Sequence, residues 1–170
     1  MNFELSEEQE LMRDSFARFL DEQSSTVRVR AAMPSGFDAK MWREFAELGA
    51  LSIRVPEDAG GLGLGLLDAA LLMEEAGRTL VSGPLAETLV SARLLALLGG
   101  QDDLLSRVLA GQAVASIALH DIAQQPLQWI AGGAVAEAVI ARKGDEVVLV
   151  AVGADDRRAE ENLASTPLAE

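Results

Sequence analysis

The sequence contains no cysteine among its 170 residues, and this absence excludes disulfides, thiolate metal sites and cysteine nucleophiles. It contains a single histidine, His120, and a lone histidine without identified partners supports neither a metal site nor a catalytic triad. The serines lie outside any Gly-x-Ser-x-Gly pattern, which is the turn that presents a serine nucleophile in many hydrolases. We therefore predict no metal site and assign no catalytic nucleophile.

Basic residues are also scarce. Lysine and arginine together number 14 against 27 acidic residues, which gives a net charge of -13. Because nucleic-acid binding relies on basic patches, this balance argues against a nucleic-acid partner, and it also disfavours docking on anionic membranes. No apolar run approaches the roughly 20 residues that a membrane-spanning helix needs. The N-terminus lacks the basic and apolar regions of a secretory signal, so we expect a soluble, cytoplasmic protein.

The first two thirds of the sequence have the periodicity of helices. Ser6 begins a capping box with Gln9, ahead of apolar positions at helical spacing, and this pattern predicts a helix of about 17 residues. Pro84 suits the first turn of a later helix. Further helices are predicted over residues 66–78, 84–98 and 101–110.

Two irregular segments are predicted between the first helix and the helix over residues 66–78. Ser24 to Phe37 is expected to be a loop, after which Asp38 caps a short helix that ends at Gly49. Leu51 to Val55 is expected to be extended, because Pro56 disfavours helix at the residue before it.

After Gly111 the pattern changes from helical periodicity to strand-like runs. A strand is predicted over residues 113–119, and residues 134–142 and 146–152 are predicted to form a hairpin around Gly144. The sequence therefore predicts an α+β fold, with an all-helical domain over residues 1–112. A small, incomplete antiparallel β domain is predicted over residues 113–170.

The run from Gly60 to Gly65 invites comparison with the dinucleotide-binding fingerprint. That fingerprint needs glycines at positions one, three and six between a strand and a helix. Neither the register that starts at Gly60 nor the one that starts at Gly61 fits. We favour a structural loop whose glycines permit positive φ angles.

Glu74, Glu75 and Arg78 form a second candidate cluster of acids and a base. An exposed ion pair between Glu74 and Arg78, four residues apart on a helix, explains this cluster without any catalytic role. We therefore predict a surface ion pair here.

Trp129 is followed by small residues and by the glycine pair Gly132-Gly133. A tryptophan in such a setting can form a flat wall that a planar ligand approaches closely. Taken alone, the pattern favours a tryptophan that anchors the β segment to its core.

Four segments occur in a fixed order and at characteristic spacings: LSEEQ at residues 5–9, WREFAELGAL at 42–51, VPEDAGGLGLG at 55–65 and EEAGR at 74–78. Together they resemble the N-terminal domain of acyl-CoA dehydrogenases. The resemblance covers residues 1 to about 112 and implies that residues 113–170 are part of the family's middle β domain. Those enzymes use FAD to desaturate acyl-CoA thioesters, and a C-terminal helical bundle provides the glutamate that removes the substrate α-proton.

The resemblance implies a set of binding residues and no catalytic residue in this chain. Ala131 stands where the family has a threonine that hydrogen-bonds the flavin, so a hydroxyl donor is lost there. The implied flavin-side residues are Leu119, His120, Trp129 and Ala131, and the implied acyl-pocket residues are Glu87 and Thr88.

The implied partners are an acyl-CoA substrate, an electron-transfer acceptor and other dehydrogenase subunits in a homo- or hetero-oligomer. The chain is either the N-terminal portion of a longer, divergent dehydrogenase or a reduced subunit that pairs with a complete one. The alternative function is a non-catalytic, flavin-free assembly subunit that binds a complete dehydrogenase. An incomplete β domain leaves strand edges and apolar surface uncovered, which favours association.

Overall fold

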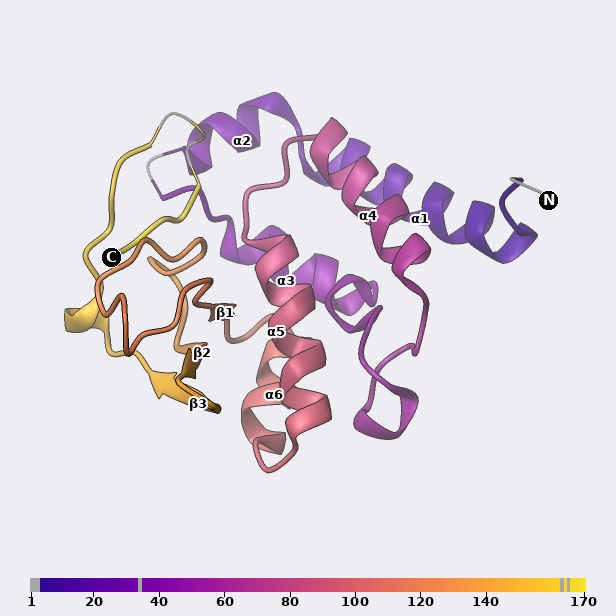
Figure 1. Cartoon of the computed structure of the whole chain (residues 1–170). Coiled ribbons are helices and arrows are strands. Elements are labelled where there is room, and N and C mark those ends of the chain that lie inside the picture. Colours follow the sequence, from indigo (N-terminus) through magenta and orange to yellow (C-terminus); the bar gives the residue numbers. More distant parts are fainter. Residues whose placement is uncertain (1–3, 34, 163, 165) are drawn as a thin grey trace.

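The described part of the chain, residues 4–33, 35–162, 164 and 166–170, forms six α-helices followed by a three-stranded sheet in this computed structural model (Figure 1). The predicted α+β class is therefore confirmed. The helices are α1 (Glu7–Gln23), α2 (Thr26–Ala32), α3 (Ala39–Glu47), α4 (Leu66–Arg78), α5 (Leu85–Leu98) and α6 (Asp102–Leu109). The strands are β1 (Ala115–Ile117), β2 (Ala138–Lys143) and β3 (Glu146–Ala151). Short 3-10 turns occur at η1 (Ala50–Ser52), η2 (Glu57–Ala59) and η3 (Ala154–Asp156).

Two helices begin at the caps that the sequence predicts. The Ser6 hydroxyl accepts from the Gln9 N–H at 3.2 Å, and the Gln9 side chain accepts from the Ser6 N–H at 3.0 Å. At the start of α3, one Asp38 carboxylate oxygen accepts from the N–H groups of Lys40 and Met41 at 3.1 and 3.0 Å. These bonds satisfy N–H groups that have no partner inside the helix.

Helix α2 occupies half of the segment that was predicted to be a loop, so that prediction is wrong for residues 26–32. Position 34 of the segment lies outside the described residues. The Ser25 hydroxyl caps α2 by accepting from the Arg28 N–H at 3.3 Å. The helix has only seven residues, too few for an amphipathic repeat to reveal it.

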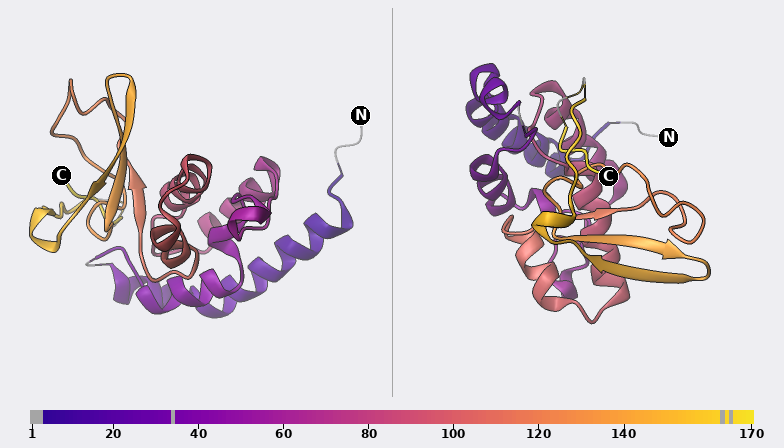
Figure 2. Two further views of the ribbon diagram at one scale, coloured as in Figure 1. Left: turned by 90° about the horizontal axis from the view of Figure 1, so that it is seen from below. Right: turned by 90° about the vertical axis from the view of Figure 1, so that its left-hand side faces the viewer.

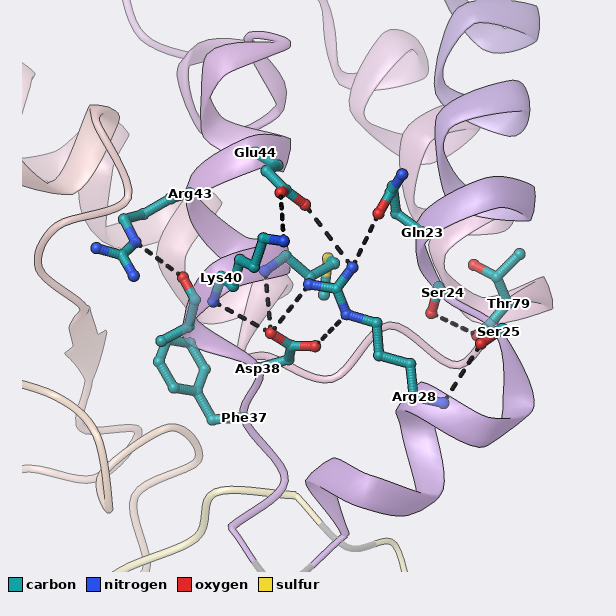
Figure 3. A network of polar contacts seen from close by, with 12 residues as sticks. Gln23, Ser24, Ser25, Arg28, Phe37, Asp38, Lys40, Arg43, Glu44 and Thr79 are labelled. Atoms are coloured by element: carbon teal, nitrogen blue, oxygen red, sulfur yellow. Dashed lines mark hydrogen bonds and ion pairs between the residues drawn. The ribbon is translucent and has the colours of Figure 1, made fainter.

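Arg28 joins α1, α2 and α3 through one polar network (Figure 3). Its guanidinium donates to both Asp38 oxygens and to the Gln23 side-chain oxygen, the latter at 2.9 Å, and it lies 3.7 Å from Glu44. The hydrogen bond from Arg28 is the main reason that the pKa of Asp38 lies below its ordinary value of 3.8. Asp38 thus caps α3 and also binds α2 to it.

Residues 51–55 were predicted to be extended, but that prediction is wrong. Residues 51 and 52 belong to the 3-10 turn η1, and residues 53–55 form a turn and a bend. Gly49 adopts φ +89° and directs the chain from α3 into η1. The Val55 N–H then donates to the Ser52 carbonyl at 3.1 Å. Pro56 restricts only the residue before it, so it does not extend the whole segment.

The glycine-rich bend is a structural loop, as predicted. Gly60 and Gly63 adopt positive φ angles of 84° and 64°. The bend folds back on residues 52–55, and the Gly63 N–H donates to the Val55 carbonyl at 2.8 Å. A Cβ on Gly61 would lie 2.0 Å from the same carbonyl oxygen, so only glycine fits there.

The helices enclose the first of two main hydrophobic cores. In Figure 1, α1 lies beside α4, and the residues between them and α3 are buried. Phe45 contacts the rings of Phe16 and Phe19 with centroid distances of 5.8 and 5.6 Å. The fully buried Trp42 lies against Gly83, where a Cβ would be 2.6 Å from the indole. This dense packing fixes the position from which α5 starts.

A second core joins helices to sheet. Leu95 of α5 and Leu105 and Val108 of α6 pack with Ala115 of β1 and Ile140 of β2, and all five are buried. The helices end at Leu109 and the first strand starts at Ala115, while the domain division near residue 112 stays a prediction.

The sheet has the order β1-β2-β3 and is mixed. β2 and β3 form the predicted antiparallel hairpin, in which Gly144 adopts φ +62° in the turn. β1 pairs parallel with β2, so the prediction of a purely antiparallel sheet is wrong at this pair. Parallel pairing arises because residues 118–137 form a long crossover between the two strands. Figure 2 shows the β2–β3 hairpin extending away from the helices.

Candidate functional site

The crossover between β1 and β2 carries all four predicted flavin-side residues. At its start, the Ala118 N–H donates to the Ile140 carbonyl at 2.9 Å, and four residues later the Ile122 N–H donates to the Arg142 carbonyl at 2.9 Å. The crossover thus advances four residues while β2 advances two. Residues 119–121 must therefore bulge out of the ladder.

This bulge presents side chains to solvent from an anchored backbone. Leu119 is 78% exposed and His120 is also exposed. The carboxylate of Asp121 accepts from the N–H groups of Ala123 at 2.8 Å and Gly144 at 3.1 Å. These backbone hydrogen bonds, first that of Ala123, lower the pKa of Asp121 and keep the carboxylate charged.

The buried side chain of Gln128 connects the bulge to the following turn. Its carbonyl oxygen accepts from the His120 N–H at 3.0 Å. Its amide nitrogen donates to the carbonyls of His120 and Gln125, both at 3.1 Å. Gln128 directly precedes Trp129, so these bonds hold the backbone of His120 close to Trp129 in the fold.

Trp129 is exposed although both of its neighbours are fixed. The residue is 68% exposed. On its other side, the Ile130 N–H donates to the Ala169 carbonyl at 2.8 Å, and the Ala169 N–H donates back at 3.2 Å. The indole therefore does not anchor a core in this chain, contrary to what its local pattern alone favoured.

The turn after Trp129 touches the start of α5. The Ser116 hydroxyl on β1 donates to the carbonyl of Ala131. A Cβ on Gly132, which has φ +76°, would lie 2.7 Å from Cβ of Pro84. The structure thus brings the turn after Trp129 against the start of the helix that carries the two acyl-pocket candidates.

Those two candidates, Glu87 and Thr88, lie one turn into α5 and differ in exposure. Glu87 is half-buried. Thr88 is fully buried, and among the described residues its hydroxyl has no hydrogen-bond partner. The neighbouring hydroxyl of Ser91 donates to the Ala115 carbonyl at 2.7 Å and so joins α5 to β1. The placement of both candidates in an acyl pocket stays a prediction.

The cluster at the end of α4 is an ion-pair network on the surface. Arg78 donates to Glu75 at 2.8 Å and to Asp21 of α1 at 2.9 Å. The predicted partner was Glu74, and the structure instead pairs Arg78 with Glu75, three residues before it. The cluster thus joins α4 to α1 on the surface.

Other parts of the described chain offer weaker sites. No group of three histidine or acidic side chains within it could hold a metal ion. None of its helices is long and apolar enough to cross a membrane. A hollow of about 740 Å³ lies between η2 and α6, but Asp58 and Asp102 line it, and their charge disfavours an anionic ligand.

Comparison with known proteins places the chain in a family. Residues 6–116 match the family model described as "Acyl-CoA dehydrogenase, N-terminal domain". This match spans more than half of the chain. The chain therefore belongs to the acyl-CoA dehydrogenase family, as its sequence motifs predicted.

Individual relatives agree with this assignment. The acyl-CoA dehydrogenase IpdE2 of Mycolicibacterium smegmatis is 33% identical over 144 residues, which cover 83% of this chain and 44% of the relative. The Tcur3481-Tcur3483 steroid ACAD, solved as a variant, has a TM-score of 0.78 and 27% identity over 96% of this chain and 53% of its own. An acyl-CoA dehydrogenase from Bacillus anthracis complexed with FAD shares the fold at 19% identity, with a TM-score of 0.75 over 98% of this chain and 35% of its own. The chain thus spans about half the length, or less, of these relatives.

Leu119, His120 and Trp129 were predicted from the sequence, but the contacts that hold them were not. The residues missed are Gln128 and Ser116. Buried polar side chains need partners, so a glutamine next to a candidate tryptophan was a usable signal. Its partner lies eight residues away in an irregular segment, however, and no periodic pattern reveals such a pairing.

Proposed function

We propose that this chain is part of an FAD-dependent acyl-CoA dehydrogenase and supplies one wall of its flavin site and acyl pocket. The observation that carries the proposal is the presentation of Trp129, which is exposed between two fixed neighbours and next to the exposed Leu119 bulge. Family membership supports the reaction, α,β-desaturation of an acyl-CoA thioester with an electron-transfer acceptor downstream. When bound, FAD supplies the hydride acceptor.

The residues present fit the apolar face of a planar ring better than its polar edge. Exposed Leu119 and Trp129 offer apolar and aromatic surface, which suits stacking. Ala131 offers no side-chain donor, and its carbonyl already accepts from Ser116. We infer that this chain holds a flavin through apolar contact, with polar contacts contributed from elsewhere.

The acyl side of the site is proposed at the first turns of α5. Glu87 and Thr88 follow Pro84, which the Trp129 turn approaches through Gly132. This proximity supports a flavin wall and an acyl wall that belong to one site. We assign no catalytic base within residues 1–170, so the group that removes the α-proton is supplied by other residues of the assembly.

Calorimetric titration with FAD tests this function. We expect the full chain to bind FAD. We expect Trp129→Ala to raise the dissociation constant about tenfold, because a stacking surface is lost. Leu11→Ala is the matched control, since Leu11 is 71% exposed on α1, away from the crossover. Equal affinity in wild type and Trp129→Ala, or no binding by the wild type, would contradict the proposal.

A second candidate function is a flavin-free subunit that assembles with a complete dehydrogenase. It is favoured by β3, whose residues are almost all exposed, including Val147 at 57% and Val150 at 41%. Native mass spectrometry of the chain mixed with a complete acyl-CoA dehydrogenase distinguishes the two functions. A complex in which this chain carries no flavin supports the subunit, and flavin bound to this chain supports the first proposal.

A further inference from the structure

Gln128 is unusual within the crossover because it is buried while its surroundings are exposed. This residue is 8% exposed, whereas Leu127 and Trp129 on either side are 71% and 68% exposed. A glutamine amide offers two N–H donors and one carbonyl acceptor. Here both donors and the acceptor are used in three bonds to backbone groups.

The pattern of these bonds imitates a strand. Gln128 accepts from the N–H of His120 and donates to the carbonyl of the same residue. A neighbouring β-strand pairs a residue through the same two groups. Because residues 119–121 bulge out of the ladder with β2, the side chain replaces the missing backbone partner at the bulge.

The effect on Trp129 follows from chain connectivity. Trp129 lies between Gln128, bound to His120, and Ile130, bound to Ala169. Loss of the Gln128 amide would free one of these two neighbours and would also release the backbone beneath Leu119. The Ile130 side would remain bonded.

We propose that Gln128 is a positioning residue that holds Leu119, His120 and Trp129 as one preorganised ligand-facing surface. Its effect on flavin affinity rests on the proposed function. Its effect on the position of Trp129 does not. A preorganised surface binds more tightly because less freedom is lost on binding.

The test uses Gln128→Met, which keeps the length and removes all three hydrogen bonds, and Gln124→Met as control. Gln124 lies in the same crossover, is exposed, and its side chain makes no hydrogen bond to the described residues. The first measurement, without ligand, is amide hydrogen exchange by NMR together with the fluorescence anisotropy of Trp129. A Trp129→Phe protein provides the signal of Trp42 alone.

In Gln128→Met we expect the amide hydrogen of His120 to exchange at least tenfold faster than in the wild type. We also expect the fluorescence anisotropy of Trp129 to decrease. The Ile130 amide serves as internal reference and keeps its protection, because its bond to Ala169 remains. We expect FAD affinity to fall about tenfold, because the preorganisation that is lost corresponds to the contribution of about one hydrogen bond. Gln124→Met should match the wild type in all three measurements.

If Gln128→Met leaves the His120 exchange and the Trp129 anisotropy unchanged, the positioning role is wrong. If the wild type binds no FAD, the proposed function fails, and the exchange and anisotropy still decide the role of Gln128. Should Gln128→Met fail to fold, Gln128→Glu is measured in its place. Glutamate retains the acceptor for His120 and loses the donors, so it should keep the His120 protection and still loosen Trp129.

Discussion

The two tryptophans of this chain show how differently its two regions use the same side chain. Trp42 is fully buried in the helical core, where it packs against Phe37 with a centroid distance of 5.8 Å. Trp129 is 68% exposed in the crossover of the β region, although both of its neighbours are hydrogen-bonded, Gln128 through its side chain and Ile130 through its backbone. The helical region therefore uses its tryptophan to stabilise the fold, while the crossover presents its tryptophan as apolar surface.

Removal of each indole gives the largest contrast. Trp42→Ala should cost about 4 kcal/mol of the free energy of unfolding, because a large buried side chain is replaced by a cavity. Trp129→Ala should cost less than about 0.5 kcal/mol, as is usual for exposed positions. Urea denaturation followed by circular dichroism measures both. A cost for Trp129→Ala that approaches that of Trp42→Ala would contradict the division between the regions.

The glycine bend contributes to the stability of the helical region through its close packing. Gly61→Ala should cost about 3 kcal/mol, since its Cβ would meet the Val55 carbonyl and the backbone must shift. Gly77→Ala is the matched control, because nothing lies within 4 Å of a Cβ there and the site is in α4. The control should gain about 0.5 to 1 kcal/mol, from the higher helix propensity of alanine. Thermal unfolding of both variants decides whether the bend is as tightly packed as described.

The polar network of Figure 3 shows whether the helical region also depends on partly buried hydrogen bonds. Asp38→Ala should cost about 2 kcal/mol, as at the upper end for loss of an N-cap. The pKa of Asp38 is lowered in the folded state, so its charged form adds stability above its ordinary value of 3.8. That stability is lost as the pH falls below this value and through the lower folded pKa.

The matching measurement compares the wild type with Asp38→Asn at pH 6 and near pH 3. The difference in the free energy of unfolding between the two proteins should shrink at the lower pH, because below its ordinary pKa of 3.8 Asp38 binds a proton more readily in the unfolded wild type than in the folded one. A difference that grows on acidification would show that the sign of the linkage is wrong.

The smallest effect on stability is expected at β3. Val147→Lys should change the free energy of unfolding by less than about 0.5 kcal/mol, because Val147 is exposed in the folded chain. A lysine on an edge strand opposes strand pairing between molecules, so self-association should decrease. Sedimentation velocity measures this change, and unaltered association would show that β3 is not an associating surface.

Local signals in the sequence predicted much of the helical region. Ser6 and Asp38 identified helix starts, and the glycines of the bend were correctly interpreted as loop residues. The sequence did not reveal α2, whose stability depends on Arg28 reaching Asp38 ten residues away. It likewise missed the parallel pairing of β1 with β2, because strand direction depends on the path of a long crossover.

The candidate site was predictable as a set of residues and not as an arrangement. Leu119, His120 and Trp129 came from resemblance to a family, while the bonds of Gln128 and Ser116 that arrange them join positions with no common period. Such contacts are determined by tertiary structure. They are therefore visible only once the crossover is folded.

Whether the crossover binds a flavin is decided by an NMR titration of the full chain with FAD, which locates the ligand. We expect the indole N–H of Trp129 and the amides of Leu119, His120 and Ala131 to shift, while the indole N–H of buried Trp42 does not. Shifts confined to the hollow between η2 and α6, or no shifts at all, would contradict the claim that the crossover forms the flavin wall.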